Sequence, residues 1–259
     1  MVKAIFFDID GTLISFRTHR ISPAVLDALS RLRQKGIKLF LATGRHASSI
    51  GAAQDDFPFD GCITLNGQYC FTQDTVLRKM VFSPAQTAQL ADVLEQTGAP
   101  AVILEEKDGY MVNPDSRLDL FPNQLNIPLP PEIPASDVRG RELYQAVVFL
   151  SKEEEKAVGT PFQGLDAMRW HPDFADVISQ GGGKDRGMDA ILEHFKISLN
   201  DTMAFGDGEN DLPMLRHAHI GVAMGNASDE VKSQADYVTD CVDEDGILSA
   251  LIHFGILEP

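Results

Sequence analysis

The order of the first predicted elements, strand, helix, strand, restricts this chain to folds that contain a parallel sheet. Residues 3–7 (KAIFF) are a short apolar run typical of a buried strand. A helix is predicted to start at Pro23, with Ser22 as its N-cap and Gly36 just beyond its end. A second apolar run covers residues 37–42. Two strands joined by a helix form a right-handed crossover, which makes them parallel strands of one sheet.

The later sequence predicts that this sheet is interrupted by an inserted domain. A third strand ends at Asn66, and residues 68–82 alternate as a hairpin does. The pattern then changes to a helix over residues 84–97, several strand-like runs and a proline-rich connection. We expect an α/β fold with a discontinuous parallel-sheet core and an inserted α+β domain. The expected limits are residues 1–82 and 181–259 for the core, and residues 83–180 for the insertion.

The alternation of helices and strands resumes after the insertion. A helix is expected to end near Phe195, and strands are predicted at TMAFGD and IGVAMG. Further helices are predicted up to Leu215, from about Ser228, and up to about Phe254. These elements complete the predicted parallel-sheet core.

The charge and the cysteines exclude several classes of function. Lys and Arg number 22 against 38 Asp and Glu, so the formal net charge is -16 at pH 7. Such a chain lacks the basic surface that nucleic acid or an anionic membrane requires, and no stretch of about 18 apolar residues could span a bilayer. The three cysteines lack Cys-x-x-Cys spacing. We expect a cytoplasmic protein with neither nucleic-acid nor membrane partners, and make no prediction of oligomeric state.

Polar side chains follow the predicted core strands at the points where the strands end. Asp8 and Asp10 follow the first strand, Thr43 the second and Asn66 the third. Lys184 opens the helix by which the chain returns to the core. The motif GDGEND, after a later strand, adds Asp207, Glu209, Asn210 and Asp211. Because ligands bind at the carboxyl ends of parallel strands, we expect these side chains to converge.

The expected convergence of Asp8, Asp10 and Asp207 predicts a divalent metal site. Carboxylates in a confined site repel one another unless a cation lies among them. Oxygen ligands favour a hard cation, with Mg²⁺ preferred. A carboxylate held against such a metal, beside a lysine ammonium and a threonine hydroxyl, is arranged to attack phosphorus and form an aspartyl-phosphate.

Four parts of the chain match the signature motifs of a known family. DIDGT, ATGR, Lys184 and GDGEND resemble the four motifs of the haloacid dehalogenase superfamily. The inserted α+β domain, TLNG and GVAMGNA are similar to its Cof-type branch (class IIB cap), especially to bacterial hexose-phosphate phosphatases. The resemblance covers essentially the whole chain. It implies a Rossmann-like core that carries the chemistry and an inserted α+β cap domain that selects the substrate.

The resemblance also implies a role for each site residue. Asp8 would be the nucleophile, and Asp10 would protonate the leaving oxygen and later activate water as a base. Thr43 and Lys184 would hold the transferring phosphoryl group. The implied substrate contacts are Gly44, Arg45 and Asn66. The implied Mg²⁺ ligands are Asp8, the backbone carbonyl of Asp10, Asp207, and Asn210 or Asp211, directly or through water.

Other interpretations of these motifs fit the sequence less well. An Asp-Gly pair is commonly a turn and a lone threonine commonly a helix cap, but their joint occurrence at the ends of the expected strands favours catalysis. GDGEND is not an EF-hand loop, because Leu212 and Ala218 occupy the positions of its glycine and glutamate. QGGGKDRG lacks the upstream glycine and the Ser or Thr of a P-loop. Many relatives have serine where this chain has Gly183, which predicts a permissive loop.

We therefore expect a Mg²⁺-dependent phosphatase that acts on small phosphorylated metabolites, with hexose phosphates first. A cap of roughly one hundred residues over the site would exclude large phosphoproteins and bulk water. Two alternatives stay open: a sugar phosphomutase that uses the same aspartyl-phosphate, and a non-catalytic phosphate-binding module. Trp170, in the predicted cap, either faces the substrate or packs in the cap core.

Overall fold

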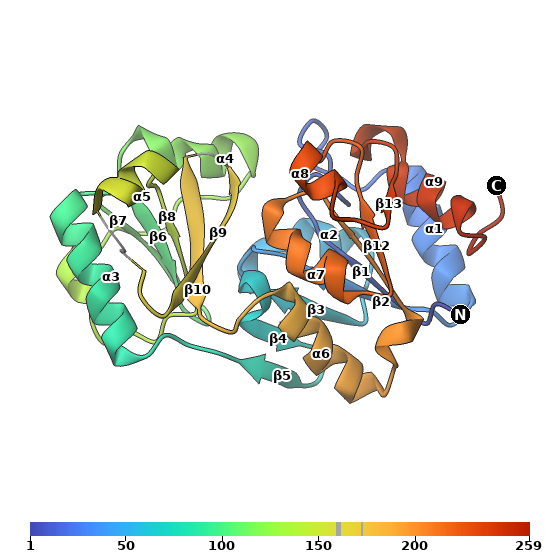
Figure 1. The fold of residues 1–259 in the computed structure, drawn as a ribbon, viewed down its shortest axis with the longest axis horizontal. Coiled ribbons are helices and arrows are strands. Elements are labelled where there is room, and N and C mark those ends of the chain that lie inside the picture. The colour runs from blue at the N-terminus through green and yellow to red at the C-terminus, as the bar shows by residue number, and fades with distance from the viewer. Residues whose placement is uncertain (159–161, 172) are drawn as a thin grey trace. The chain divides into compact units, whose positions relative to one another are not determined.

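The computed structural model describes residues 1–158, 162–171 and 173–259, without the side chains of residues 52 and 170. Trp170 therefore lies outside the described side chains. The chain divides into two compact units. Unit 1 comprises Met1–Arg45, Ser49–Arg78 and Gly183–Pro259, and unit 2 comprises His46–Ser48 and Lys79–Gly182. Unit 2 is thus inserted in the sequence of unit 1, and the green and yellow segments of Figure 1 belong to it.

Unit 1 is built on a sheet that has eight strands among the described residues. In spatial order the strands are β13 (Tyr237–Val238), β12 (Ile220–Ala223), β11 (Thr202–Gly206), β1 (Ala4–Phe7), β2 (Lys38–Ala42), β3 (Gly61–Thr64), β4 (Tyr69–Phe71) and β5 (Val76–Lys79). The strands from β13 to β3 pair in parallel, whereas β4 runs antiparallel to β3. The predicted parallel-sheet core of an α/β fold is confirmed.

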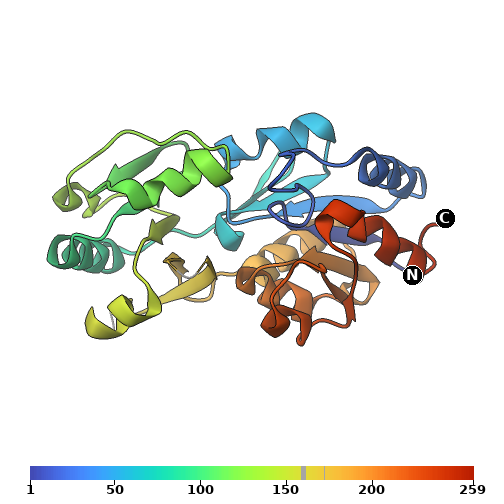
Figure 2. The same ribbon diagram turned by 90° about the horizontal axis from the view of Figure 1, so that it is seen from above.

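Helices cover both faces of this sheet. They are α1 (Pro23–Gln34), α2 (Gly51–Asp56), α6 (Lys184–Phe195), α7 (Leu212–His217), α8 (Asp229–Lys232) and α9 (Gly246–His253). In β1, Ile5 and Phe7 belong to the apolar layer shared with α1, α2 and α9, while Ala4 and Phe6 belong to the layer shared with α6, α7 and α8. Figure 2 shows α1 and α7 on opposite sides of the strands. This alternation explains why β1 is apolar at every position.

Helix α1 begins and ends as its sequence predicts. The Ser22 side chain accepts a hydrogen bond from the Val25 backbone N–H at 3.2 Å, and Pro23 occupies the first turn. Gly36, beyond the end of the helix, has a φ of +79°.

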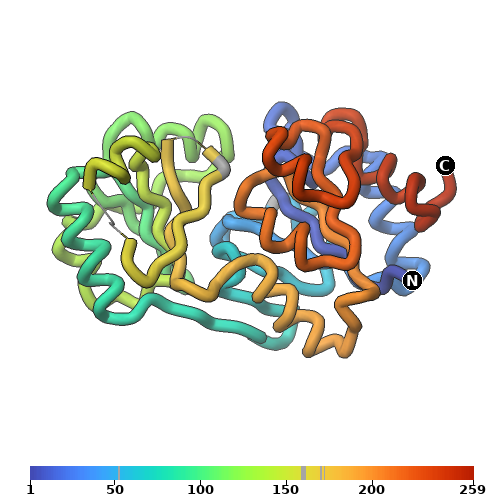
Figure 3. Tube along the Cα trace, in the orientation of Figure 1, coloured from blue at the N-terminus to red at the C-terminus, as the bar shows by residue number. Residues whose placement is uncertain are grey.

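Both chain ends lie at one end of unit 1 (Figure 3), where Lys35 Nζ donates a hydrogen bond to the Ile256 carbonyl at 2.7 Å.

Unit 2 is an α+β unit with its own antiparallel sheet. In spatial order its described strands are β7 (Gly109–Val112), β6 (Ala101–Leu104), β8 (Gln145–Val148), β10 (Phe174–Ser179) and β9 (Leu165–His171). Its helices are α3 (Pro84–Thr97), α4 (Leu120–Gln124) and α5 (Lys152–Val158). α3 has the predicted limits, because Ser83 forms a capping box with Gln86 and Gly98 ends it in a left-handed conformation.

The structure differs from the expected elements near the C-terminus. The helix expected from Ser228 ends after the single turn of α8, and the chain then adds β13, which the sequence did not indicate. A two-residue strand gives too short an apolar pattern to detect.

None of the helices within the described parts of the chain has the length and apolar character needed to cross a bilayer.

Candidate active site

The site of unit 1 lies where four adjacent parallel strands end. Asp8 directly follows β1, and Asp207 directly follows β11, its hydrogen-bonded neighbour. Thr43 follows β2, and Asn66 lies in the short turn after β3. Because β11, β1, β2 and β3 are consecutive in the sheet, their ends present these side chains along one edge.

Lys184, the first residue of α6, lies between two carboxylates. Its Nζ is 2.6 Å from Asp8 Oδ1 and 2.5 Å from Asp211 Oδ1, and its side chain is fully buried. Burying an unpaired ammonium group costs much free energy. The Lys184 ammonium is paired and hydrogen-bonded to two carboxylates, which offset this cost. The structure thus brings together three residues that are far apart in the sequence.

Asp211 uses its second oxygen to order the turn after β11. Its Oδ2 accepts the backbone N–H groups of Asp207 and Gly208, each at 2.9 Å. A Cβ atom on Gly206 would lie 2.5 Å from the Cβ of Asp211, so only glycine permits this close approach. Because Oδ2 accepts two N–H groups and Oδ1 accepts only Lys184, Oδ1 is the Asp211 oxygen with a lone pair left for a metal.

The charges of this cluster shift its titration. Burial and the Asp211 carboxylate raise the pKa of Asp8 to about 7, although Lys184 opposes them. Burial and the Asp8 carboxylate raise the pKa of Asp207. Burial alone would lower the pKa of Lys184, but Asp211 and Asp8 outweigh it and raise that pKa. Lys184 is therefore charged at neutral pH, and one ammonium does not neutralise three carboxylates.

The residues fit a hard divalent cation. Asp8, Asp207 and Asp211 each offer a carboxylate oxygen within 4.8 Å of the others. The donors are all oxygen atoms, as Mg²⁺ prefers, and their mutual repulsion would be relieved by a positive charge. Of the three, Asp8 and Asp207 have carboxylate oxygens that do not already bind Lys184 or the turn.

Asp10 is held by Arg45 in a two-point contact. Arg45 Nε donates to Asp10 Oδ2 at 2.7 Å, and Arg45 Nη2 donates to Asp10 Oδ1 at 2.6 Å. A third donor, Nη1, binds the Ser49 carbonyl at 2.9 Å. In this structure the Arg45 guanidinium binds Asp10, and the predicted contact of Arg45 with the substrate stays a prediction. Such a fork is specific to arginine.

The remaining predicted residues form the neighbouring edge of the site. Thr43 is buried, and its Oγ1 accepts the Arg45 backbone N–H at 3.0 Å. Asn66 is buried in a left-handed conformation, and its Oδ1 accepts from Asn210 Nδ2 at 3.1 Å. Gly44 is half-buried between Thr43 and Arg45. The substrate roles of these residues stay predictions.

The glycine-rich loop before Lys184 has a defined place. The Gly183 backbone N–H donates to the Asn66 carbonyl at 3.1 Å. A Cβ on Gly67, whose φ is +89°, would lie 2.0 Å from the Gly183 carbonyl oxygen. Gly183 itself has a φ of 123°, which a residue with a Cβ rarely adopts. The loop that the sequence predicts to be permissive is therefore held against the turn after β3.

Two residues that the site analysis of the sequence did not single out also contact Asp207. Thr12 Oγ1 donates to Asp207 Oδ1, and Asn226 Nδ2 donates to Asp207 Oδ2, each at 3.1 Å. Thr12 belongs to DIDGT and Asn226 to GVAMGNA, so both motifs carried a signal. Their partner could not be predicted, because it depends on the path of the loops.

Comparison with known proteins gives one consistent result. A family model described as haloacid dehalogenase-like hydrolase matches residues 5–251. YkrA of Bacillus subtilis, a candidate phosphatase, is 33% identical over 261 residues, which cover 99% of each protein. The solved HAD subclass IIB sugar phosphatase BT4131 is 42% identical with a TM-score of 0.94, over 99% of this chain and 100% of that one. The phosphatase BT1666 of Bacteroides thetaiotaomicron is 36% identical with a TM-score of 0.90, over 99% and 96%.

The matched region includes every site residue described above, from Asp8 to Asn226. A phosphatase of this class needs a carboxylate nucleophile and groups that neutralise a phosphoryl charge, and unit 1 places the Asp8 carboxylate beside the Lys184 ammonium. The sequence motifs, the parallel-sheet core and the relatives agree. The chain belongs to the haloacid dehalogenase-like hydrolase family, in its Cof-type branch, and is a phosphatase.

Proposed function

We propose that this chain is a Mg²⁺-dependent phosphatase that hydrolyses small phosphate esters, hexose phosphates first, through an aspartyl-phosphate on Asp8. The observation that carries the proposal is the buried contact of Lys184 Nζ with Asp8 Oδ1 at 2.6 Å, next to Asp207. The choice of sugar phosphates rests on the likeness to BT4131, which is a sugar phosphatase. The reaction type therefore has support from the site, and the substrate from a relative.

In the first step, an oxygen of Asp8 forms a bond to phosphorus while the bond from phosphorus to the ester oxygen breaks. The leaving oxygen takes a proton from Asp10 and departs as the alcohol. Lys184 and Thr43 would hold the transferring phosphoryl group, whose charge is spread over its outer oxygens. Asp8, Asp207 and the Asp10 carbonyl would hold Mg²⁺, which when bound would neutralise further negative charge.

In the second step, water attacks the phosphorus of the aspartyl-phosphate. Asp10 accepts a proton from that water, the bond from phosphorus to the Asp8 oxygen breaks, and inorganic phosphate leaves. Both Asp10 oxygens accept hydrogen bonds from Arg45 in this structure. Each of these oxygens has a second lone pair, so Asp10 can accept or donate a proton there while Arg45 stays bound.

A panel of phosphate esters assayed with Mg²⁺ and with excess chelator tests this function. We expect release of inorganic phosphate from hexose phosphates that stops on chelation, and no turnover by Asp8→Asn. Activity that persists in chelator would contradict the metal, and appreciable turnover by Asp8→Asn would contradict the nucleophile. Isomerised sugar phosphate instead of free phosphate would identify a phosphomutase.

A further inference from the structure

Asn226 is a residue of the GVAMGNA segment that the proposed mechanism does not use. It lies three positions after the end of β12 and is exposed, yet its amide takes part in three hydrogen bonds. Nδ2 donates to the Gly11 carbonyl at 2.9 Å and to Asp207 Oδ2 at 3.1 Å, while Oδ1 accepts the Val242 N–H at 2.9 Å. One side chain thus joins three segments of unit 1.

Both oxygens of Asp207 are held by neutral donors. Thr12 binds Oδ1 and Asn226 binds Oδ2, each at 3.1 Å. A carboxylate oxygen has two lone pairs, so each oxygen can accept one such bond and still bind a cation. A Cβ atom on Gly11 would lie 2.2 Å from Asp207 Oδ2, so this carboxylate fits closely against the loop after β1. The orientation of Asp207 is therefore set by its neighbours.

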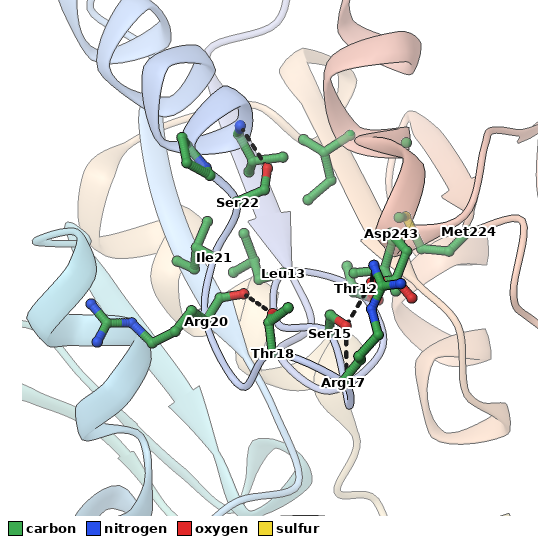
Figure 4. A pocket seen from close by; sticks show the side chains of 15 residues that line it. Thr12, Leu13, Ser15, Arg17, Thr18, Arg20, Ile21, Ser22, Met224 and Asp243 are labelled. Atoms are coloured by element: carbon green, nitrogen blue, oxygen red, sulfur yellow. Dashed lines mark hydrogen bonds and ion pairs between the residues drawn. The ribbon is translucent and has the colours of Figure 1, made fainter.

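The other side of Asn226 is anchored to a segment that is itself fixed. Asp243, next to Val242, accepts hydrogen bonds from Ser15 Oγ at 2.7 Å and Arg17 Nη2 at 3.1 Å (Figure 4). Arg17, Ser15 and Asp243 lie along a cavity of about 210 Å³ that Thr12 also lines. The N–H that orients Asn226 thus comes from a residue whose neighbour, Asp243, is held by Ser15 and Arg17.

We propose that Asn226 is a positioning residue that holds the Asp207 carboxylate in the orientation required to bind the metal ion. The inference rests on the proposed function, because it takes Asp207 to be a Mg²⁺ ligand. Partners that orient a metal ligand typically contribute a factor of 10–100 to metal affinity. Since Asn226 is exposed and water can replace part of its contact, we expect about tenfold, the lower end of that range.

A Mg²⁺ titration followed by the melting temperature, with no substrate present, tests the inference. Mg²⁺ that binds the folded chain raises this temperature in a concentration-dependent way, which yields an apparent Kd. We expect this Kd to rise about tenfold in Asn226→Ala. Asn200→Ala is the matched control, because Asn200 is exposed in unit 1 and its side chain has none of the described hydrogen bonds. Its Kd should equal that of the wild type.

Val242→Pro tests the same contact without altering Asn226. Val242 is the first residue of a short 3₁₀ turn, where proline is tolerated, and the change removes the N–H that Asn226 Oδ1 accepts. We expect a smaller rise of the Mg²⁺ Kd, which would support the inference even if Asn226→Ala did not fold. An unchanged Kd in the folded variants overturns the inference alone. If the melting temperature of the wild-type chain does not change with Mg²⁺ concentration, both the inference and the proposed function are overturned.

Discussion

Charge balance dominates the site at the scale of single residues. Asp8, Asp207 and Asp211 share one ammonium, that of Lys184, because the guanidinium of Arg45 is engaged with Asp10. Burial, together with the neighbouring carboxylates, raises the pKa of Asp8 to about 7 and that of Asp207 above its usual value. The charged carboxylates of the metal-free site therefore destabilise the fold at neutral pH, and a bound cation would offset their mutual repulsion.

The first prediction concerns the pH dependence of stability in the metal-free protein. Because the pKa of Asp8 is higher in the folded state than its usual 3.8, the folded state binds this proton more tightly. Stability should fall as the pH rises from about 4 to about 7. Asp8→Asn should then melt at a higher temperature than the wild type at pH 8, with the difference shrinking towards pH 4. The melting temperatures of both proteins are measured in chelator across this pH range. A difference between them that stays constant with pH would refute this prediction.

Gln68 supplies a second prediction at this scale. It is fully buried, and neither its amide nitrogen nor its oxygen has a hydrogen-bond partner among the described residues. A buried amide without partners costs about 1–3 kcal/mol. We expect Gln68→Met, a replacement of similar length, to raise the free energy of unfolding by about 1 kcal/mol.

Urea denaturation of Gln68→Met measures this gain, with Gln234→Met as the matched control at an exposed site. The control should change stability by less than about 0.5 kcal/mol. A loss of stability in Gln68→Met would show that a bound water or ligand satisfies the amide, and so would contradict the prediction.

The sequence predicted that Asp8, Asp10 and Asp207 converge, whereas the carboxylates that lie together are those of Asp8, Asp207 and Asp211. It did not predict how each side chain is oriented. The proximity of Asp8, Asp207 and Lys184 could be predicted from the sequence, because the carboxyl ends of adjacent parallel strands share an edge. The two-point contact of Arg45 with Asp10 and the contact of Asn226 with Asp207 could not be predicted. Both depend on rotamers and on the path of loops, which leave no periodic pattern in the sequence.

At the scale of elements, close contacts between turns build the site. Gly67, after β3, lies against the carbonyl of Gly183, which precedes α6 and Lys184. We expect Gly67→Ala to lower the free energy of unfolding by about 3 kcal/mol or more, because a Cβ would meet that oxygen at 2.0 Å in a left-handed conformation. The displaced loop should also slow phosphate release by moving Lys184.

Gly36→Ala is the matched control for this change. Gly36 has a similar φ of +79°, but a Cβ there would have no neighbour within 4 Å. Its cost should be that of the left-handed backbone alone, about 1–2 kcal/mol. The difference between the two variants in urea denaturation measures the clash with Gly183. Equal losses would show that the turn after β3 does not constrain the Lys184 loop.

Elements with strong local signals were predicted, whereas the short strand β13 and the early end of α8 were not. α1 and α3 have N-cap serines followed by proline, and both begin where the sequence predicts. β13 has two residues and exists only because β12 is beside it. α8 ends after one turn, although its Ser228 cap is present. Local signals fix where a helix starts more reliably than how long it runs.

At the scale of the whole molecule, the proposed catalytic residues lie in one unit, and the other unit has an apolar core of its own. All the proposed catalytic and metal-binding residues belong to unit 1, whereas unit 2 has its own five-stranded sheet and apolar clusters among the described residues. The chain first enters unit 2 at His46, directly after Arg45. The residue that holds Asp10 is therefore adjacent in sequence to a boundary between the units.

The central claim is that Asp8 becomes covalently phosphorylated, and trapping that species tests it most directly. Asp10→Asn should slow hydrolysis of the intermediate but spare its formation from p-nitrophenyl phosphate, whose leaving group needs little protonation. Acid quench during turnover with Mg²⁺, borohydride reduction and peptide mass spectrometry should then find homoserine at position 8. An unmodified Asp8 in protein that is turning over, or homoserine at another aspartate, would contradict the account.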